Sequence, residues 1–387
     1  MKAPRSTKEC EIIHDADLLK KMMDDMASTP SLFQPTNYWK TYEDETIKYI
    51  ETNGLDTFRS YSTSTLASFG AGTRRKAPLT SWFPKRLLEF SGYRHSATSA
   101  RLFHVYSELV SFAESFAPLL QIFNIRDIIR QKEETESSQI EQLLNEKYRC
   151  SKLLDEASGL QRLGSVEDSL IGCPFDKFDI NGKAYTLSFL RAYDHLAYVA
   201  RQINVHDLGG VLDLGSGCGA SAEVYVKALP DIAYYCCDIP PQLYVAQQYL
   251  SAVFPGKVYT YENYVRGEDM DRAKYRVFCI PSWALATMSK TDFGLFINTA
   301  SFQEMEPEIV QNYYTLIRDR IKYAYLFQLT HGIYKRTSPS SGGSINPLQI
   351  DDYLSIFRDF TLLHREEFFR IQNPCTRLLL QKKPSNN

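Results

Sequence analysis

The stretch that decides the fold is Val211-Leu-Asp-Leu-Gly-Ser-Gly-Cys-Gly219, a short apolar run followed by glycines at alternating positions. The apolar run predicts a buried strand, and residues 220–229, directly after the last glycine, have the periodicity of a helix. Glycine lets the backbone turn tightly and lets a ligand approach the main chain. Because ligands of open α/β sheets bind where the strands end, the loop is expected to form part of a binding site.

The chain from this loop to its C-terminus alternates between strand-like and helical segments. Further strands are expected at residues 232–238, 293–298, 323–330, 361–369 and 377–382, and further helices at 242–254, 308–321 and 349–357. Residues 276–280 are the expected third strand, with 258–262 as the alternative. Such alternation predicts a parallel sheet covered by helices. We therefore expect a Rossmann-like α/β domain with a mostly parallel seven-stranded sheet. Its last two strands should pair as an antiparallel edge hairpin, because no helix separates them.

The first half of the chain is expected to be mainly helical. Helical periodicity runs through residues 9–27, 36–51, 99–124, 125–157 and 188–203, and Asn181-Gly182 predicts a hairpin turn. A Ser/Thr/Gly-rich loop at 60–76 ends in Arg74-Arg75-Lys76, which we interpret as a solvated cluster in preference to a phosphate contact. We divide the chain into residues 1–185, which cover the acceptor side or dimerise, and residues 186–387, the Rossmann-like domain.

Composition excludes several classes of protein. The net charge of −2 argues against nucleic acid and anionic membranes as partners. A polar start and no long apolar run predict neither a signal peptide nor a spanning helix. The eight cysteines form no Cys-x-x-Cys pair, so we expect reduced, mostly buried thiols, no zinc and a cytoplasmic location. We expect no metal site.

Two cofactors compete for the glycine loop. Gly215-x-Gly217-x-x-Ala220, with Asp238 at the end of the next strand, also satisfies the looser dinucleotide fingerprint. S-adenosylmethionine is favoured because Asp213 ends the strand where a carboxylate can meet a cationic amino group, and because Gly219 supplies a third glycine. We therefore predict an S-adenosylmethionine-dependent methyltransferase and a class I methyltransferase domain, with an NAD-dependent oxidoreductase as the rival.

The expected cofactor contacts follow the strand ends. Asp213, Gly215, Gly217 and Gly219 should surround the methionine half, and Asp238 should hold the ribose. The remaining expected contacts are Ile239 against adenine, Ser282 and Trp283 at the adenine rim, and Asn298 at the end of the fourth strand. If 258–262 is the third strand, Glu262 and Asn263 replace Ser282 and Trp283.

The chain resembles the bacterial sugar O-methyltransferases. The resemblance spans about residues 31–335, and the residues that carry it are Gln34-Pro-Thr-Asn-Tyr-Trp39, Gly54-Leu-Asp-Thr-Phe-Arg59, Ile171-Gly-Cys-Pro174, Ile180-Asn-Gly-Lys183, Leu190-Arg-Ala-Tyr193, the glycine loop, Asp238-Ile-Pro240 with the helix after it, and Ile297-Asn-Thr-Ala-Ser-Phe-Gln-Glu-Met305. It implies O-methylation of a sugar, nucleotide-linked sugar or sugar-containing small molecule. The chain departs from the family pattern at Cys173, often Asn there, and at Cys218 within the glycine loop.

An oxygen acceptor benefits from a general base, because a hydroxyl is a weak acid. Glu304 is the first candidate for the base or an acceptor contact, with Gln303 beside it, and His331 after the fifth strand is the second candidate. The alternatives are a first-turn acid that complements a helix dipole for Glu304 and a solvent-exposed loop residue for His331. His195 is interpreted as a packing residue. A peptide or other natural-product acceptor, and a non-catalytic binding module on the same fold, are the competing functions.

Overall fold

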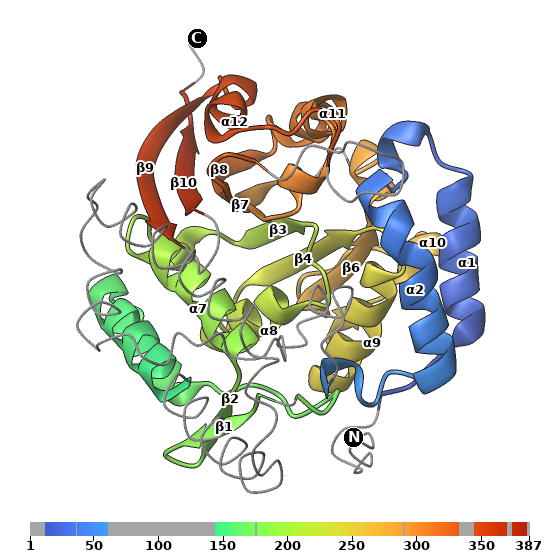
Figure 1. Cartoon of the computed structure of the whole chain (residues 1–387), viewed down its shortest axis with the longest axis horizontal. Coiled ribbons are helices and arrows are strands. Elements are labelled where there is room, and N and C mark those ends of the chain that lie inside the picture. Colours follow the sequence, from blue (N-terminus) through green and yellow to red (C-terminus); the bar gives the residue numbers. More distant parts are fainter. Residues whose placement is uncertain are drawn as a thin grey trace, which may run out of the picture. The chain divides into compact units, whose positions relative to one another are not determined.

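The predicted glycine loop follows a fully buried strand in the middle of a mostly parallel sheet (Figure 1). The computed structural model describes residues 12–35, 37–60, 144–174, 176–288, 291–332, 344–369 and 374–384. Within these ranges the sheet has eight strands in the order β5-β6-β4-β3-β7-β8-β10-β9. The strands are β3 (Gly210–Leu214), β4 (Ala233–Asp238), β5 (Val258–Tyr259), β6 (Val277–Pro281), β7 (Phe293–Thr299), β8 (Ile321–Leu329), β9 (Phe360–Phe369) and β10 (Pro374–Lys382).

Strand direction confirms the predicted fold class. Strands β5, β6, β4, β3, β7 and β8 pair in parallel, whereas β10 is antiparallel to both β8 and β9. The sequence predicts seven strands, and the described residues form eight, because both candidates for the third strand belong to the sheet. β6 lies beside β4 and so takes the third-strand position, while the two-residue β5 extends the edge beyond it.

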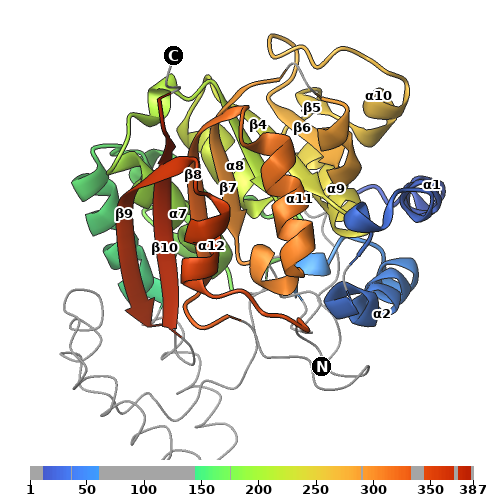
Figure 2. The same cartoon turned by 90° about the horizontal axis from the view of Figure 1, so that it is seen from above.

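Helices cover both faces of this sheet (Figures 1 and 2). On one face lie α7 (Leu187–Ala200), α8 (Ala220–Ala228) and α9 (Gln242–Val253), and on the other lie α11 (Pro307–Ile317) and α12 (Ile350–Ile356). Successive side chains of a strand point to opposite faces. Leu212 and Leu214 therefore join the core with Tyr314 and Phe357 beneath α11 and α12, whereas Asp213 between them faces α8.

The N-terminal segment packs beside the β5-β6 side of the sheet. Helix α1 (Ala16–Ala27) contacts α9, and the Tyr261 hydroxyl of the short helix α10 (Tyr261–Val265) donates to Asp25 of α1. Helix α2 (Asn37–Asn53) lies beside α1 in Figures 1 and 2. The predicted hairpin is present as β1 (Phe178–Ile180) and β2 (Lys183–Tyr185), with Asn181 and Gly182 in the left-handed region at φ 52° and 76°. Its turn therefore has the positive φ values that Asn-Gly favours.

The chain separates into two compact units, residues 1–73 with 148–387, and residues 74–147. Of the second unit only residues 144–147 are described, and they belong to a helix. The predicted helix 99–124, most of 125–157 and the Arg74-Arg75-Lys76 cluster lie outside the described residues. The proposed division at residue 185 concerns function and stays a prediction.

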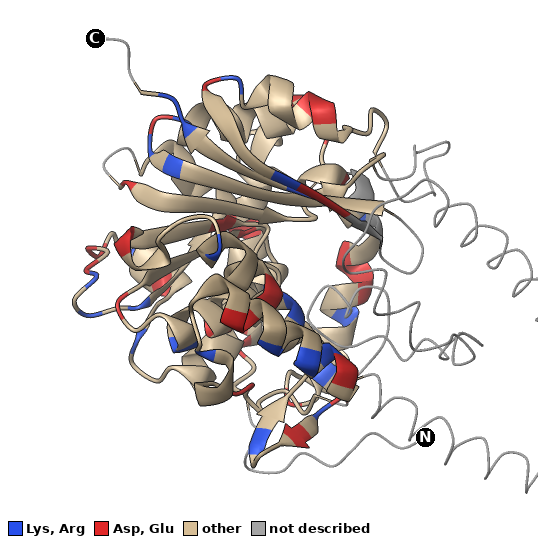
Figure 3. Cartoon of the chain, turned by 90° about the vertical axis from the view of Figure 1, so that its left-hand side faces the viewer, with Lys and Arg blue, Asp and Glu red and all other residues tan. Residues whose placement is uncertain are grey.

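Surface charge is mixed on the side that carries α7 and β9. On β9 one basic residue, Arg365, is followed by Glu366 and Glu367, and basic and acidic residues are interspersed on the helices below it (Figure 3). This mixture matches the small net charge of the sequence. No helix in the described part of the chain is long and apolar enough to cross a membrane.

Candidate active site

The order of the strands places a topological switch point between β3 and β7. From β3 the chain proceeds outward to β4 and β6, and it then returns to β7 on the other side of β3 and continues to β8. The loops that leave β3 and β7 therefore run in opposite directions at the carboxyl edge of the sheet. Ligands of open α/β sheets bind in this position. Residues 215–219 and 300–304 form the two loops.

Glycines in the first loop have backbone conformations that favour glycine. Gly215, Gly217 and Gly219 have φ of 77°, 57° and 86°, the left-handed region that L side chains rarely adopt. A Cβ on Gly215 would overlap the Ser301 side chain, and one on Gly219 would lie 2.6 Å from Leu250 Cδ1. The loop thus packs directly against the loop from β7 and against α9.

Asp238 joins the end of β4 to the glycine loop. Its Oδ2 accepts the backbone N–H of Gly217 at 2.7 Å, and its Oδ1 accepts that of Ile239 at 2.8 Å. The side chain is half-buried, and burial raises the pKa of the carboxyl to about 7. Each carboxylate oxygen has two lone-pair sites, so each can accept a further hydroxyl donor. Ile239 is half-buried beside it, at the predicted adenine side.

Asp213 is a buried carboxylate with one oxygen unused. It is 1% exposed, and its Oδ2 accepts the Tyr234 hydroxyl at 2.6 Å, whereas Oδ1 has no partner among the described residues. Burial raises the pKa of Asp213 to about 7. A cationic group nearby would favour the ionised form of this acid. The prediction that Asp213 meets a cationic amino group fits this environment.

Asn298 holds the two loops together from below. Its Nδ2 donates to Leu214 O at 2.9 Å and to Ser301 Oγ at 2.7 Å, and its Oδ1 accepts from Phe302 N and Gln328 Nε2. These four bonds use the full hydrogen-bonding capacity of an amide side chain. Asn298 is also completely buried, so its amide positions the two loops, and its contact with the cofactor stays a prediction.

The acid predicted as the general base lies at this edge. Glu304 is half-buried, and its Oε2 accepts the indole N–H of Trp39 from α2 at 3.0 Å. Burial raises the pKa of Glu304 to about 8; the hydrogen bond from Trp39 acts in the opposite direction, and the charge of Asp238 raises it further. Glu304 and Asp238 are therefore close enough to interact electrostatically, as a shared site requires.

The other two catalytic candidates occupy different environments. Gln303 is buried, and its Oε1 accepts the backbone N–H of Leu329 at 2.8 Å, so its amide oxygen links the loop to the end of β8. His331 is exposed on the turn that follows β8, in agreement with the solvent-exposed alternative. His195 packs as predicted: its Nδ1 pairs with the Tyr325 hydroxyl at 2.6 Å, and its ring lies against Phe327.

The residues considered for the adenine rim follow adjacent strands. Ser282 is buried and Trp283 half-buried, directly after β6, where Trp283 makes an edge contact with Tyr261. Glu262 accepts from Gln247 Nε2 at 2.8 Å, and Asn263 closes a capping box with Thr260 at the start of α10. Because Asn263 is committed to the cap and β6 lies beside β4, the geometry favours Ser282 and Trp283 for the rim.

A buried ion-pair network supports the glycine loop, and sequence reasoning did not identify it. Arg59, 4% exposed, donates to Asp168 Oδ2 at 2.6 Å, to Ser169 O at 2.8 Å and to the Tyr249 hydroxyl of α9 at 3.2 Å. Tyr249 in turn donates to Glu223 on α8. Arg59 also lowers the pKa of Cys218, which burial raises to about 11. The network therefore lies against the glycine loop.

Two segments of the family resemblance meet in this network. The backbone N–H of Arg59 donates to Gly172 O at 2.9 Å, and a Cβ on Gly172 would overlap the Phe58 ring. Only the resemblance drew attention to these residues, because nothing in the local pattern marks an arginine as buried. The network explains physically why the segments 54–59 and 171–174 belong together.

The cysteines correct one expectation. Cys218, Cys236, Cys237, Cys279 and Cys375 are buried and form no disulfide, as predicted, but Cys173 is disulfide-bonded. The expectation that all cysteines are reduced is wrong for Cys173, because sequence spacing does not reveal a pair joined by the fold. In the described ranges no group of three or more His, Cys, Asp or Glu residues could hold a metal ion.

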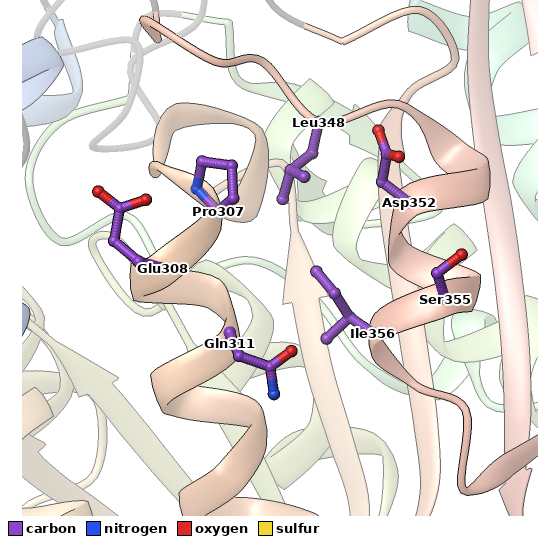
Figure 4. A pocket seen from close by; sticks show the side chains of 7 residues that line it. All are labelled: Pro307, Glu308, Gln311, Leu348, Asp352, Ser355 and Ile356. Carbon is purple, nitrogen blue, oxygen red and sulfur yellow. The ribbon is translucent and has the colours of Figure 1, made fainter.

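An open cavity of about 500 Å³ lies apart from these residues, between α11 and α12 (Figure 4). Its lining residues are Pro307, Glu308, Gln311, Leu348, Asp352, Ser355 and Ile356. None of them belongs to the loops at the switch point. The candidate site is therefore defined by the strand ends and not by this cavity.

Comparisons with known proteins give matches among solved structures. No family model matches the chain, and no curated protein matches it. The mitomycin 7-O-methyltransferase MmcR is 12% identical with a TM-score of 0.34, over 50% of this chain and 57% of its own. The pyocyanin biosynthetic protein PhzM is 10% identical with a TM-score of 0.33, over 49% of this chain and 58% of its own. Magnesium protoporphyrin IX methyltransferase from Synechocystis PCC 6803, solved with bound SAH, is 14% identical with a TM-score of 0.36, over 51% of this chain and 86% of its own. The chain thus spans somewhat more than half the length of MmcR and PhzM.

Proposed function

We propose that this chain is an S-adenosylmethionine-dependent methyltransferase that methylates a hydroxyl on a sugar or sugar-containing small molecule. One observation carries the cofactor assignment: Asp238 and the glycine loop are joined by a hydrogen bond at the switch point of the sheet. A carboxylate in that position accepts ribose hydroxyls, and glycine backbone lets the cofactor approach.

The acidic residues of the site fit a cationic cofactor. Asp213 has an unpartnered buried oxygen, and burial raises the pKa of both Asp213 and Asp238 to about 7. A cation bound here would offset the cost of the buried negative charge. NAD carries no primary ammonium group that Asp213 could meet, whereas S-adenosylmethionine does. S-adenosylmethionine, when bound, supplies a methyl group already activated by its sulfonium.

Glu304 is the residue we assign to the acceptor. It follows β7 across the switch point from the glycine loop, and its carboxylate interacts electrostatically with Asp238. A carboxylate with a pKa of about 8 is a stronger base than an ordinary glutamate, so it removes a hydroxyl proton more readily once ionised. Its ionised fraction grows as the pH rises through 8. His331 is the second candidate for this role, and Gln303 positions the end of β8.

The sugar acceptor rests on the family resemblance, and a peptide or another natural-product scaffold is the alternative. In this proposal residues 1–185 form the acceptor-side cover, with homodimerisation as their other use. Residues 186–387 form the catalytic domain. The contact between Trp39 of α2 and Glu304 favours the cover, because it brings the N-terminal segment to the carboxyl edge of the sheet. A non-catalytic module would have no use for the buried Asp213.

Isothermal titration calorimetry of the full chain with S-adenosylmethionine, S-adenosylhomocysteine and NAD tests the cofactor assignment. We expect micromolar binding of both sulfur ligands, a loss of at least tenfold in affinity for Asp238→Ala, and no binding of NAD. Asp231→Ala is the matched control, because Asp231 is exposed at the opposite end of β4. NAD binding would establish the oxidoreductase, and no binding of any ligand to folded protein would favour the non-catalytic module.

A further inference from the structure

Trp39 brings the N-terminal segment into contact with Glu304, the candidate general base. It lies in the first turn of α2, and its indole N–H donates to Glu304 Oε2 at 3.0 Å across 265 positions of sequence. Both side chains are half-buried. The contact is directional, because the donor of an indole ring lies at a single edge position.

The surroundings of Glu304 give this hydrogen bond a specific effect. The charge of Asp238 on β4 raises the pKa of Glu304. The charge of Glu304 in turn raises the pKa of the Tyr353 hydroxyl on α12. Burial and Asp238 both disfavour the carboxylate. The hydrogen bond from Trp39 favours it, because an N–H donor stabilises the charged acceptor. Trp39 therefore opposes the two effects that would keep Glu304 protonated.

Packing alone does not account for the contact. The Trp39 ring makes an edge contact with Tyr42 on the same helix, with centroids 6.5 Å apart, which any large aromatic side chain could make. The bond to Glu304 needs the indole nitrogen. It also fixes the direction of one of the two carboxylate oxygens, Oε2.

We propose that Trp39 is a positioning residue, which holds the Glu304 carboxylate at the carboxyl end of β7 so that α2 completes the acceptor side of the site. The proposal rests on the function proposed above for Glu304. Trp39 acts through Glu304 and needs no contact with the cofactor. Trp39 is the last residue of the segment 34–39, one of the segments that carry the family resemblance. Its contact with Glu304 would give this segment a role in the site.

The titration of Glu304 tests this proposal without any ligand. The full chain is labelled with ¹³C at the glutamate carboxyl carbons, and its NMR spectrum is followed from pH 5 to 9.5. We expect the glutamate signal that disappears in Glu304→Gln to have a midpoint well above the ordinary value of 4.5. In Trp39→Phe, which keeps an aromatic ring and removes the N–H, this midpoint rises by about one pH unit. In Asp238→Asn it falls, because a neighbouring negative charge is removed.

Trp283→Phe is the matched control, since Trp283 is also half-buried but contacts Tyr261 instead; it leaves the midpoint unchanged. An unchanged midpoint in folded Trp39→Phe, or no glutamate with an alkaline midpoint, overturns the proposal. If circular dichroism shows that Trp39→Phe does not fold, the pH dependence of tryptophan fluorescence in the wild type and in Glu304→Gln tests the proposal instead. The emission of the wild type then changes at the Glu304 midpoint and that of Glu304→Gln does not; emission that changes equally in both also overturns the proposal.

Calorimetry with S-adenosylhomocysteine separates the two levels of inference. Trp39→Phe binds it within about twofold of the wild type, because Trp39 acts on the acceptor side. If Trp39 alters the titration of Glu304 but no variant binds a sulfur ligand, the pairing stands and the proposed function fails. If the ligand binds and the titration is independent of Trp39, the positioning role alone fails.

Discussion

The carboxylate of Asp238 and the backbone N–H of Gly217 are joined at 2.7 Å, which ties the end of β4 to the loop that follows β3. This bond gives the loop a fixed anchor at its middle glycine. It also places a negative charge beside the main chain of the loop, where burial raises the pKa of Asp238 to about 7. The site is thus arranged before a ligand binds, and its charge depends on pH near neutrality.

Binding of S-adenosylhomocysteine should therefore strengthen as the pH rises from 6 to 8. Below pH 7 both Asp213 and Asp238 hold a proton, and the ligand's ammonium and ribose hydroxyls favour the ionised acids. Each acid that must ionise changes the affinity by up to about tenfold per pH unit below its pKa. Calorimetry in buffers of different ionisation enthalpy should show proton release at pH 6.5.

Asp213→Asn provides the control for this pH dependence. The variant should release fewer protons and show a shallower increase in affinity, because only Asp238 still titrates. Equal proton release by both proteins would mean that Asp213 does not respond to the ligand.

Gly215→Ala should destabilise the chain and abolish cofactor binding. The new Cβ meets two obstacles, a φ of 77° and an overlap with the Ser301 side chain. Gly256→Ala is the control for backbone strain without overlap. Gly256 has a φ of 72°, and no atom lies within 4 Å of an added Cβ. Strain at one left-handed residue costs about 1 kcal/mol, so any loss beyond that in Gly215→Ala measures the overlap.

Urea unfolding of both variants checks this expectation, with calorimetry for the ligand. Ser301→Ala combined with Gly215→Ala should recover part of the lost stability, because it removes the Oγ atom from the overlap. Equal destabilisation by Gly215→Ala and Gly256→Ala would show that the loops from β3 and β7 do not pack as described.

Local patterns sufficed to predict the order of the core elements. The apolar runs from β3 to β10 alternate with helical periodicity, and each expected strand of the Rossmann-like domain is present. The count differs at β5, because residues 258–262 and 276–280 are alternatives for one strand in the sequence prediction, whereas both contribute a strand to the sheet. The sequence also predicts that Gly215 and Asp238 follow or end adjacent strands, as the structure shows, and their contacts with a cofactor stay a prediction.

Residues whose roles depend on distant partners could not be predicted in the same way. Asn298 lies at the end of the fourth strand, where the sequence predicts a cofactor contact, and the structure adds its hydrogen bonds with Leu214 and Gln328. Trp39 and Arg59 reach the site from the first 60 residues, and no local period reports contacts of that range. Their burial and pairing emerge only when the tertiary structure brings the segments together.

Asp213→Asn should make the chain more stable at neutral pH relative to the wild type. Because the pKa of Asp213 is raised from 3.8 to about 7, the folded chain keeps a proton between these pH values that the unfolded chain has released. The contribution of Asp213 to the free energy of unfolding therefore falls as the pH rises through this window, by about 1.4 kcal/mol per unit, and is constant above it. The amide of asparagine does not titrate.

Urea unfolding at pH 4.5 and pH 7.5 measures the effect as a difference between the two proteins. Asp231→Asn, exposed at the other end of β4, should follow the wild type at both pH values. If the gap between wild type and Asp213→Asn is the same at pH 4.5 and pH 7.5, Asp213 does not carry the raised pKa.

Arg59→Met should be the most destabilising of these substitutions. It removes the cation from a buried pair with Asp168 in which the two side chains are 4% and 2% exposed, and it also removes donors to Ser169 O and Tyr249. Removing one partner of a buried ion pair costs about 3–5 kcal/mol, because the remaining charge is left buried without compensation. The stability of Arg59→Lys should lie between that of the wild type and that of Arg59→Met. Lysine keeps the positive charge, but one ammonium group cannot replace a planar guanidinium that reaches three acceptors.

The exposed pair of Arg266 and Glu268, with side chains 58% and 37% exposed, provides the contrast. Arg266→Met should leave the urea midpoint unchanged, because solvent screens an exposed pair. Adding Asp168→Asn to Arg59→Met should recover part of the loss, since the uncompensated carboxylate is then gone. If Arg59→Met unfolds at the same urea concentration as Arg266→Met, the network does not support the fold. If it is destabilised and still binds S-adenosylhomocysteine with wild-type affinity at low urea, the network stabilises the chain without shaping the glycine loop.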